Sequence, residues 1–321
     1  MDQTVLSMMI NCRKSEKKLF LHIMPETIIH IGYPKTATTW FIRKFYPNIR
    51  NADTIYYDNI KFDITPGNEV FEINYEKTLP EKEKLIIVTH AFAGLVNLYW
   101  ENGKYRELFL KNLKNLYPGS SIVLFIRNQF DFMASIYSSY LKKGGSYTIQ
   151  ELFSEKFTSD GKFFSFEYLK YDKLIKMYQE QFGKDKVHVY VYEEFLESND
   201  TFLKDYIHLF GLDIDLNDLS FVKSNEKLRK GLISLVRATN SFIKNGAKPK
   251  YNFFNIPITY SIINDHIDKL NQFKIWGKKL DSKNMLGDEL TAFVDEYYKE
   301  SNHDLINSYD LQSIKRFNYP L

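Results

Sequence analysis

The chain of 321 residues contains a single cysteine, Cys12, so it cannot form an internal disulfide bond. Low cysteine usage is typical of proteins from a reducing compartment. No run approaches the roughly 18–20 apolar residues that a membrane-spanning helix needs, and residues 1–13 lack the charged start and apolar stretch of a signal peptide. We therefore expect a cytoplasmic protein without a transmembrane segment.

The sequence also lacks a large excess of positive or negative charge. It contains 43 Lys and Arg residues and 40 Asp and Glu residues, so the net charge is +3. This balance gives no reason to expect nucleic acid as a partner. Any anion-binding site must therefore be formed by a small number of neighbouring residues. The sequence shows no cluster of Cys and His at metal-ligand spacing. We therefore expect no metal cofactor.

Short runs of β-branched residues alternate with segments of helical periodicity along the chain. The runs lie at 27–31, 85–89, 121–126 and 187–192, and the helical segments at 38–45, 99–117, 130–142 and 167–182. This alternation predicts an α/β fold with a doubly wound, mostly parallel sheet flanked by helices. We expect a single domain over 1–321, with a core over about 24–245 and a C-terminal helical extension over about 246–321.

A further helix is predicted to begin with a cap at Asn199 or Asp200 and to end before Gly211. Helices are also expected over 230–244 and 285–298. Residues 49–83 and 248–257 show no sustained period, so the first segment is predicted to be a long connection over the carboxyl edge of the sheet and the second an irregular aromatic stretch.

Residues 31–40, with the sequence IGYPKTATTW, lie where a phosphate-binding loop would follow the first strand. In nucleotide hydrolases this loop reads G-x-x-x-x-G-K-[ST], and its lysine serves the terminal phosphate. With Gly32 as the first glycine, Thr38 takes the place of that lysine, and Lys35 stands three residues earlier on the turn. The loop amides still suit an anion. Lys35 is therefore expected to face the bridge between a bound phosphate and the group that is transferred.

These residues resemble the 5′-phosphosulfate loop, Y-P-K-[ST]-G-T-T-W, of sulfotransferases that use 3′-phosphoadenosine 5′-phosphosulfate (PAPS). The resemblance implies the P-loop-like fold of that family, PAPS as donor and 3′-phosphoadenosine 5′-phosphate (PAP) as product. The matching donor-binding positions are Tyr33, Pro34, Lys35, Thr36, Ala37, Thr38, Thr39 and Trp40. Ala37 replaces the family glycine. If this position needs a positive φ, alanine strains the turn by about 1 kcal/mol.

A second anion site is expected at the end of the third run, where Arg127 is followed eight residues later by Ser135. An arginine at a strand end and a serine two helical turns further along can close on one phosphate. The segment resembles the family's 3′-phosphate motif, R-[DN]-P-x-D-x-x-x-S, with Gln129 in place of proline.

Two shorter segments extend the resemblance. Arg229, Lys230 and Gly231 are similar to the Arg-Lys-Gly that clasps the same 3′-phosphate, although a solvated helix end also explains them. Tyr192 begins a Y-E-E-F segment that is similar to the family's Y-E-D-[LF]. The resemblance implies that this tyrosine lies near the adenine, and the alternative is an aromatic ring packed under the sheet.

His90 ends the second run and is the expected general base, because a histidine with a pKa of roughly 6.5 accepts protons near neutral pH. The resemblance sharpens this choice. Sulfotransferases of phenols and steroids carry a catalytic histidine in K-T-H at this strand end, similar to Thr89-His90, and carbohydrate sulfotransferases commonly have a glutamate. Lys35 would stabilise the leaving phosphate oxygen without a metal.

The resemblance covers about 27–231, with a trace at residues 298–305, YKESNHDL, which is similar to the terminal Y-x-x-S-N-x-x-L of bacterial carbohydrate-type members. It implies a bacterial enzyme whose acceptor hydroxyl lies on a glycan, glycolipid or secondary metabolite, with acceptor contacts from 49–83 and 248–257. Two alternatives remain open: a P-loop kinase that uses ATP and Mg²⁺, and a non-catalytic nucleotide-binding protein. The acceptor and the oligomeric state do not follow from the sequence.

Overall fold

The computed structural model describes residues 25–56, 60–65, 68–73, 81–89, 103, 105–153, 164–219, 227–243, 250, 251, 253 and 266–321. Five strands form one sheet in the order β2-β5-β1-β6-β7, and all neighbours are parallel. The strands are β1 (Glu26–Ile31), β2 (Ala52–Ile55), β5 (Lys84–Thr89), β6 (Ser121–Ile126) and β7 (Val187–Val191). The four predicted strands are confirmed to within one residue at each end.

Side chains of the central strands alternate between two hydrophobic clusters, one on each face of the sheet. In β1, Ile29 and Ile31 belong to the first cluster and Ile28 to the second. Every residue of β6 is buried, as expected for a parallel strand covered on both sides. The predicted doubly wound α/β fold is therefore confirmed.

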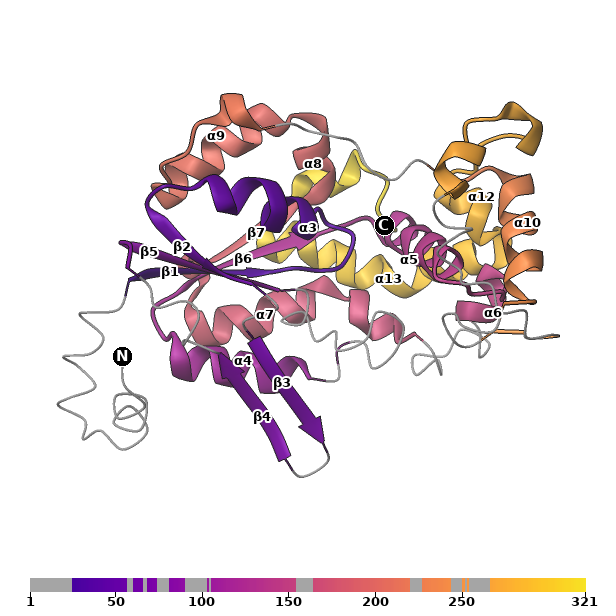
Figure 1. Cartoon of the computed structure of the whole chain (residues 1–321). Coiled ribbons are helices and arrows are strands. Elements are labelled where there is room, and N and C mark those ends of the chain that lie inside the picture. The colour runs from indigo at the N-terminus through magenta and orange to yellow at the C-terminus, as the bar shows by residue number, and fades with distance from the viewer. Residues whose placement is uncertain are drawn as a thin grey trace.

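Helices cover both faces of the sheet. Figure 1 shows α4 and α7 on one side and α8 and α9 on the other. The first cluster includes residues of α4 (Arg106–Leu116), α5 (Gln129–Lys142), α7 (Tyr171–Phe182) and α13 (Asp288–Tyr309), and the second those of the helix after β1, α8 (Tyr192–Glu197) and α9 (Asn199–Phe210).

The predicted helices after β1 and β6 are confirmed, with some differences in length. The first runs from α3 (Thr38–Trp40) through a π-helical segment, η1 (Phe41–Phe45), into a 3-10 turn, η2 (Tyr46–Asn48). Helix α5 starts one residue before the predicted 130–142. The segment predicted at 167–182 divides into a 3-10 turn, η6 (Phe166–Leu169), and α7. Of the helix predicted at 99–117, residues 99–102 and 104 lie outside the described residues.

Residues 49–83, predicted to be a long connection over the carboxyl edge of the sheet, contain three strands. Strand β2 pairs with β5, and β3 (Ile60–Thr65) pairs antiparallel with β4 (Asn68–Ile73). The four residues of β2 are too few for an apolar period to become visible, and its two middle residues are only partly buried. Strand β2 is recognised by its hydrogen-bonded pairing with β5, and its own sequence shows no apolar period.

Glycines set several helix ends. Gly211, with φ of 54°, ends α9 as predicted, whereas the N-cap of this helix is Ser198 and not Asn199 or Asp200. Gly287, with φ of 78°, separates α12 (Ser282–Leu286) from α13, so the helix predicted at 285–298 starts at Asp288 instead and continues to Tyr309. Helix α10 (Lys230–Asn240) is shorter than the predicted 230–244, and most of 248–257 lies outside the described residues.

The other described elements are short: α6 (Ile149–Phe153) and the 3-10 turns η7 (Lys184–Lys186), η8 (Leu216–Asp218), η9 (Lys274–Trp276) and η10 (Gln312–Lys315). Within the described ranges, no helix combines the length and the apolarity that crossing a bilayer requires.

Candidate functional site

The carboxyl ends of β1, β6 and β7 lie side by side because these strands are parallel neighbours. The loop that begins at Gly32 follows β1, Arg127 follows β6, and Tyr192 follows β7. Open parallel sheets bind their ligands at this edge. The fold therefore brings the predicted 5′-site loop, the predicted 3′-site arginine and the predicted adenine contact to one place.

Hydroxyl groups of the loop after β1 close it on itself. Thr36 Oγ1 donates to the Tyr33 carbonyl oxygen at 2.6 Å, and Thr38 Oγ1 donates to the same oxygen at 3.3 Å. A Cβ at Gly32 would lie 2.5 Å from Thr38 Oγ1, so the close approach requires glycine there. Thr36 and Thr38 are buried and shape the loop, and Thr39 is exposed.

Two non-glycine residues of this loop have left-handed backbone conformations. Lys35 has a φ of 69° and Ala37 a φ of 60°. The sequence suggests this conformation for Ala37 and gives no sign of it for Lys35. Thr36, between them, is not left-handed, and such alternation turns successive N–H groups toward a common point. The helix that starts at Thr38 has no side-chain cap. Turns of this kind can form a concavity that binds anions, and we call this loop the cradle.

Tyr33 anchors this cradle in the core. Its hydroxyl donates to the Tyr168 carbonyl oxygen at 2.9 Å and accepts from Arg106 Nη2 at 2.5 Å. Burial raises the pKa of Tyr33 to about 12, so the hydroxyl stays neutral. Pro34 is also buried, whereas the Trp40 ring is partly exposed and packs on Phe195, with 5.5 Å between ring centres.

Lys35 and Arg127 bring two cations to the cradle. Arg127 Nη1 donates to the Lys35 carbonyl oxygen at 2.8 Å and so ties the end of β6 to the loop. Burial, together with the nearby charges of Arg127, Lys143 and Lys142, lowers the pKa of Lys35 to about 8. Arg127 Nε is buried and has no hydrogen-bond partner among the described residues. Crowded cations beside an unsatisfied donor indicate a site for an anion.

Tyr192 supports the arginine. The guanidinium carbon of Arg127 lies 5.0 Å from the centre of the Tyr192 ring, within the range of a cation–π interaction. The ring is partly buried, and burial raises the pKa of its hydroxyl. This contact fixes the guanidinium over the ring. Whether Tyr192 also meets an adenine stays a prediction.

A cavity of about 90 Å³ opens beside Arg127. This volume suits a phosphate group and is far below the roughly 300–1,000 Å³ of pockets that enclose a drug-sized ligand. The predicted Ser135 lines it. Other lining residues not foreseen from the sequence are Ser138, Ser139 and Lys142 of α5, and Lys227. The α5 residues share the helical spacing of Ser135 by three, four and seven positions, a signal that could have identified them.

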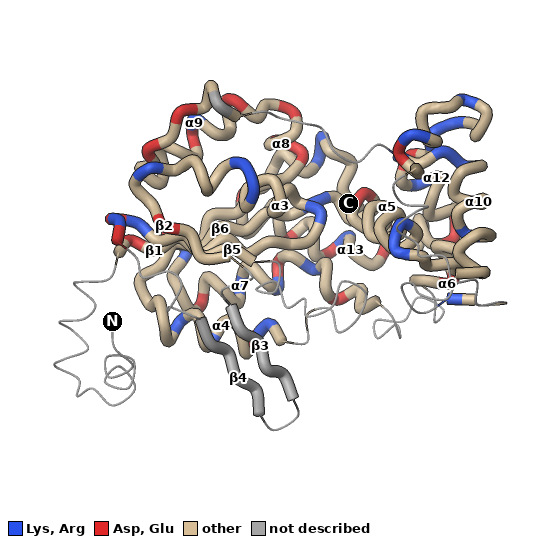
Figure 2. The backbone as a smooth tube through the Cα atoms, viewed as in Figure 1, with Lys and Arg blue, Asp and Glu red and all other residues tan. Residues whose placement is uncertain are grey.

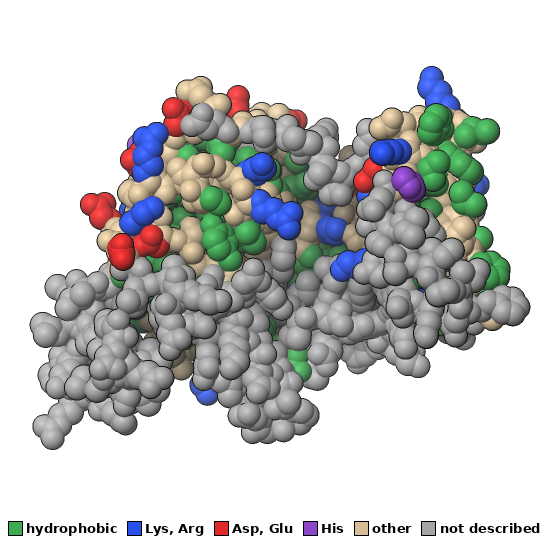
Figure 3. Space-filling view, in the orientation of Figure 1, with side chains coloured by type: hydrophobic (Ala, Val, Ile, Leu, Met, Phe, Trp, Pro, Cys, Tyr) green, Lys and Arg blue, Asp and Glu red, His purple; other side chains and the backbone are tan. Residues whose placement is uncertain are grey.

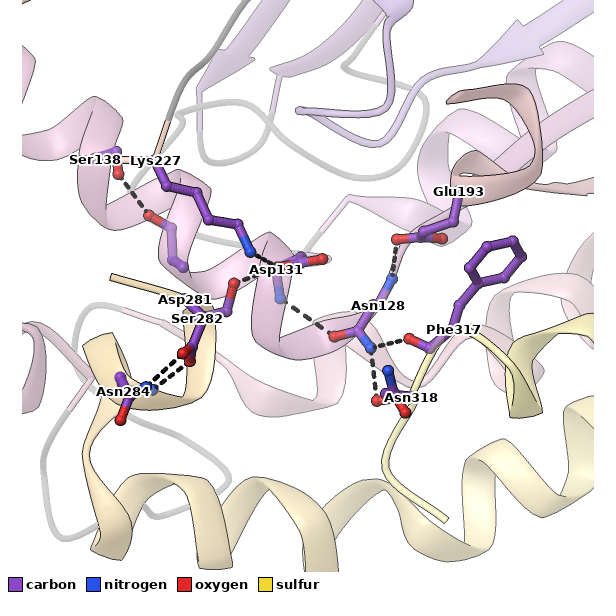
Figure 4. Close-up of polar contacts among 11 residues, drawn as sticks. Asn128, Asp131, Ser138, Glu193, Lys227, Asp281, Ser282, Asn284, Phe317 and Asn318 are labelled. Atoms are coloured by element: carbon purple, nitrogen blue, oxygen red, sulfur yellow. Dashed lines mark hydrogen bonds and ion pairs between the residues drawn. The ribbon is translucent and has the colours of Figure 1, made fainter. Parts of the chain in front are cut away.

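Asp131 is the carboxylate that lines this cavity. Lys227 Nζ lies 3.7 Å from Asp131 Oδ1, and Ser282 Oγ of α12 donates to the same oxygen. Figure 4 shows Lys227 and Ser282 converging on Asp131. The Lys227 side chain is 53% exposed, so it can leave Asp131 for an incoming anion at little cost.

Asn128, next to Arg127, connects the cavity to the end of the chain (Figure 4). Its Oδ1 accepts from the Asp131 N–H at 3.2 Å and caps α5. Its Nδ2 donates to the carbonyl oxygens of Phe317 at 2.9 Å and Asn318 at 2.7 Å. Its own N–H donates to Glu193 at 3.0 Å. These bonds hold the start of α5, and with it Arg127, in place.

Gln129, which stands in place of the motif's proline, contacts the segment 298–305. Gln129 Nε2 donates to Asn302 Oδ1 at 2.8 Å, and Asn302 Nδ2 donates to the Pro320 carbonyl oxygen at 2.7 Å. Both side chains are buried. Tyr298 donates to the Phe166 carbonyl oxygen at 2.8 Å. The segment 298–305 therefore connects the C-terminal residues to the start of α5.

The Arg229-Lys230-Gly231 segment begins α10. Arg229 Nε donates to the Asn271 carbonyl oxygen at 2.8 Å, and its Nη1 donates to that of Gly277 at 2.6 Å. Lys230 is exposed. A Cβ at Gly231 would lie 3.0 Å from the Trp276 carbonyl oxygen. The guanidinium is thus engaged by a neighbouring loop, and its contact with a 3′-phosphate stays a prediction.

His90 lies outside the described residues. Strand β5 ends at Thr89, whose carbonyl oxygen accepts from the Gly32 N–H at 3.3 Å. The chain therefore leaves β5 directly beside the first residue of the loop. The catalytic role of His90 stays a prediction from the sequence.

No protein-family model matches the chain, and no curated protein sequence is significantly similar. Among solved structures, a sulfotransferase from Alicyclobacillus acidocaldarius is similar with a TM-score of 0.46 and 13% identity, over 80% of this chain and 100% of that chain. The mouse sulfotransferase SULT7A1 complexed with PAP is similar with a TM-score of 0.47 and 16% identity, over 91% and 87% of the two chains. At these values the likeness assigns no activity to this chain.

The left-handed Ala37 generates a stability prediction. Ala37→Gly removes a Cβ from a left-handed residue and should raise the free energy of unfolding by up to about 1 kcal/mol, since relief of strain exceeds the added freedom of the unfolded chain. Urea denaturation measures the difference. Ala238→Gly, at an exposed position of α10, is the control and should lower stability by about 0.5–1 kcal/mol. If both variants lose the same free energy of unfolding, the backbone at Ala37 is not strained.

Proposed function

We propose that this protein is a sulfotransferase that moves the sulfuryl group of PAPS to an acceptor hydroxyl. The observation that supports this most is the hydrogen bond from Arg127 to the Lys35 carbonyl oxygen. It joins the loop after β1, in which Lys35 and Ala37 are left-handed, to a phosphate-sized cavity lined by Arg127 and Ser135. A donor that carries phosphates at both its 5′ and 3′ positions would engage both sites at once.

The loop would serve the reacting end of the donor. The acceptor oxygen attacks sulfur, the bond from sulfur to the bridging oxygen of the 5′-phosphate breaks, and that oxygen leaves with negative charge. Lys35 stabilises this charge together with the loop amides. Its pKa of about 8 keeps it mostly protonated at neutral pH. The acceptor proton goes to His90, which follows Thr89 in the sequence.

The cavity would hold the 3′-phosphate. The buried Arg127 Nε is an unused donor among the described residues, and the Ser135 hydroxyl lines the same space. Lys227 adds a charge that Asp131 holds until the phosphate enters. Arg127 thereby contacts the phosphate, while its Nη1 continues to hold the loop.

The acceptor would be a glycan, glycolipid or secondary metabolite. Two other functions compete: a kinase that uses ATP and Mg²⁺, and a nucleotide-binding protein without catalysis. Lys35 favours the sulfotransferase over the kinase, because it stands on the turn rather than at the position that serves a γ-phosphate.

Transfer of label from sulfur-labelled PAPS tests the proposal. The purified protein, mixed with an extract of its native cell, should form a labelled product. Lys35→Met and His90→Ala should each lower the rate by about 10²–10⁴-fold, because one loses leaving-group stabilisation and the other the base. Lys44→Met, at an exposed position of η1, is the matched control and should keep full activity. Turnover of ATP without use of PAPS, or PAP binding without transfer, would contradict the proposal.

The lowered pKa of Lys35 predicts how PAP binding depends on pH. Because a bound phosphate raises the lysine pKa above its free value of about 8, binding favours the protonated form. Affinity for PAP should therefore fall as the pH rises above about 8, by up to tenfold per pH unit. Calorimetric titration at several pH values measures this fall. Lys35→Arg, which stays charged, should flatten the profile, and an equally steep profile in that variant would assign the effect to another group.

Lys227 is expected to respond to the 3′-phosphate alone. Lys227→Ala should weaken PAP binding about tenfold and leave adenosine 5′-monophosphate (AMP), which has no 3′-phosphate, unaffected. Calorimetry with both nucleotides measures the difference. Arg229→Ala tests the sequence-based assignment in the same way. An equal loss for PAP and AMP in either variant would indicate a general disturbance of the fold instead of a phosphate contact.

A further inference from the structure

The loop from Asn271 to Lys279, which we call the lysine-rich loop, follows the helical residues 266–270 and precedes α12. Its sequence is NQFKIWGKK. It contains η9, in which the Trp276 N–H donates to the Phe273 carbonyl oxygen at 3.3 Å and the Gly277 N–H donates to that of Lys274 at 2.9 Å. The loop is therefore a structured turn.

Arg229 connects the two ends of this turn by hydrogen bonds. Its guanidinium donates to the carbonyl oxygens of Asn271 and Gly277. The Lys230 N–H donates to the Lys278 carbonyl oxygen at 3.2 Å, and the Leu280 N–H donates to that of Leu228 at 3.1 Å. These bonds fix the orientation of the loop relative to the start of α10. The arginine that the proposed function leaves without a contact thus has a defined structural role.

The turn presents apolar side chains to solvent. Trp276 is partly buried and packs against the core, so it anchors the loop from inside. Ile275 is 85% exposed and Phe273 is 59% exposed. A rigid turn that faces two large apolar side chains outward has the form of a docking surface, because single exposed apolar residues are common and adjacent ones held in one orientation are not.

Cations surround these apolar side chains. Residues 227–230 and 266–279 contain seven Lys and Arg residues and a single acidic residue, Asp268, which pairs with Lys142 at 2.7 Å. The whole chain has a net charge of only +3. Figure 2 shows Lys and Arg positions in the segment above α12, and Figure 3 shows hydrophobic and cationic side chains together on that surface. The charge of the molecule is therefore concentrated here.

This combination selects among three kinds of partner. A second copy of the chain would place two like-charged patches against each other across a two-fold axis, which is repulsive. A soluble polyanion would pair with the lysines and leave Phe273 and Ile275 in water. An anionic lipid surface satisfies both, since its head groups attract lysines and its interface accepts apolar side chains.

We propose that the lysine-rich loop docks this protein on an anionic membrane surface, with Phe273 and Ile275 inserted at the interface and Lys274 and Lys278 against the lipid head groups. Neither lysine forms an ion pair within the part of the chain that the structure describes. Because the loop is bonded to Leu228 and Lys230, docking holds the Lys227 side of the cavity near the membrane. The docking itself does not depend on the proposed reaction.

Sedimentation of the full chain with lipid vesicles tests the docking. The protein should bind vesicles of equimolar phosphatidylcholine and phosphatidylglycerol, and should bind vesicles of phosphatidylcholine alone only weakly. The double variant Lys274→Ala with Lys278→Ala should lose about twenty-fivefold in affinity, or about fivefold per lysine. The double variant Phe273→Ser with Ile275→Ser should lose about tenfold or more. Added salt should weaken binding of the wild type.

The matched control lies on α9, at the other end of the molecule in Figure 1. It replaces an exposed lysine and an exposed leucine, Lys204→Ala with Leu209→Ser, and should bind vesicles as the wild type does. Arg229→Ala should weaken vesicle binding because it releases the loop. Circular dichroism of each variant confirms that it is folded.

Three results would overturn the docking: equal binding to both kinds of vesicle, wild-type binding by both loop variants, or binding of polyphosphate as tight as that of anionic vesicles. Self-association that the Phe273→Ser with Ile275→Ser variant abolishes, seen by analytical ultracentrifugation, would assign the surface to a second copy and would also overturn it. Titration of the wild type with PAP, run alongside, separates a failure of the docking from a failure of the proposed function.

Discussion

The site depends on the parallel pairing of β1 between β5 and β6. Because the three strands run in the same direction and are buried on both faces, their carboxyl ends meet at one edge of the sheet. The chain leaves β1 and β6 at adjacent points there, close enough for Arg127 to donate to the Lys35 carbonyl oxygen. That hydrogen bond couples the loop to the cavity, so a shift of either strand would disturb both the loop and the cavity.

The same edge concentrates strain and unsatisfied polar groups. Lys35 and Ala37 adopt left-handed backbone conformations, and Lys35 is partly buried near other cations, which lowers its pKa. Each of these features costs stability, and they persist because the surrounding core is extensive. Tyr33 anchors the loop without a further cost in stability, because its buried hydroxyl is hydrogen-bonded to Arg106 and Tyr168. A ligand that supplies negative charge would relieve the crowding of cations.

Features set by local sequence were predictable, and features set by distant contacts were not. The runs of β-branched residues in β1, β5, β6 and β7 reveal the buried strands, and Gly211 reveals a helix end. Strand β2 is paired by its neighbour rather than by a period of its own. The bond between Asn128 and Asn318 spans 190 positions, and the Lys227–Asp131 pair also joins distant segments. Patterns of residues in a single sequence do not reveal contacts between such distant positions.

Two groups of cations in this protein differ in their hydration, and this difference separates their roles. Arg127 and Lys35 are partly buried among other cations at the edge of the sheet. Partial loss of water strengthens their attraction for a small anion at this edge of the sheet. The cations of the lysine-rich loop are exposed, so each interacts weakly and is screened by salt. Exposed cations become effective only when many act together on an extended charged surface. A partly buried cation pair and an exposed cationic loop are therefore suited to different partners. Arg229 joins the loop to the side of the cavity that Lys227 lines.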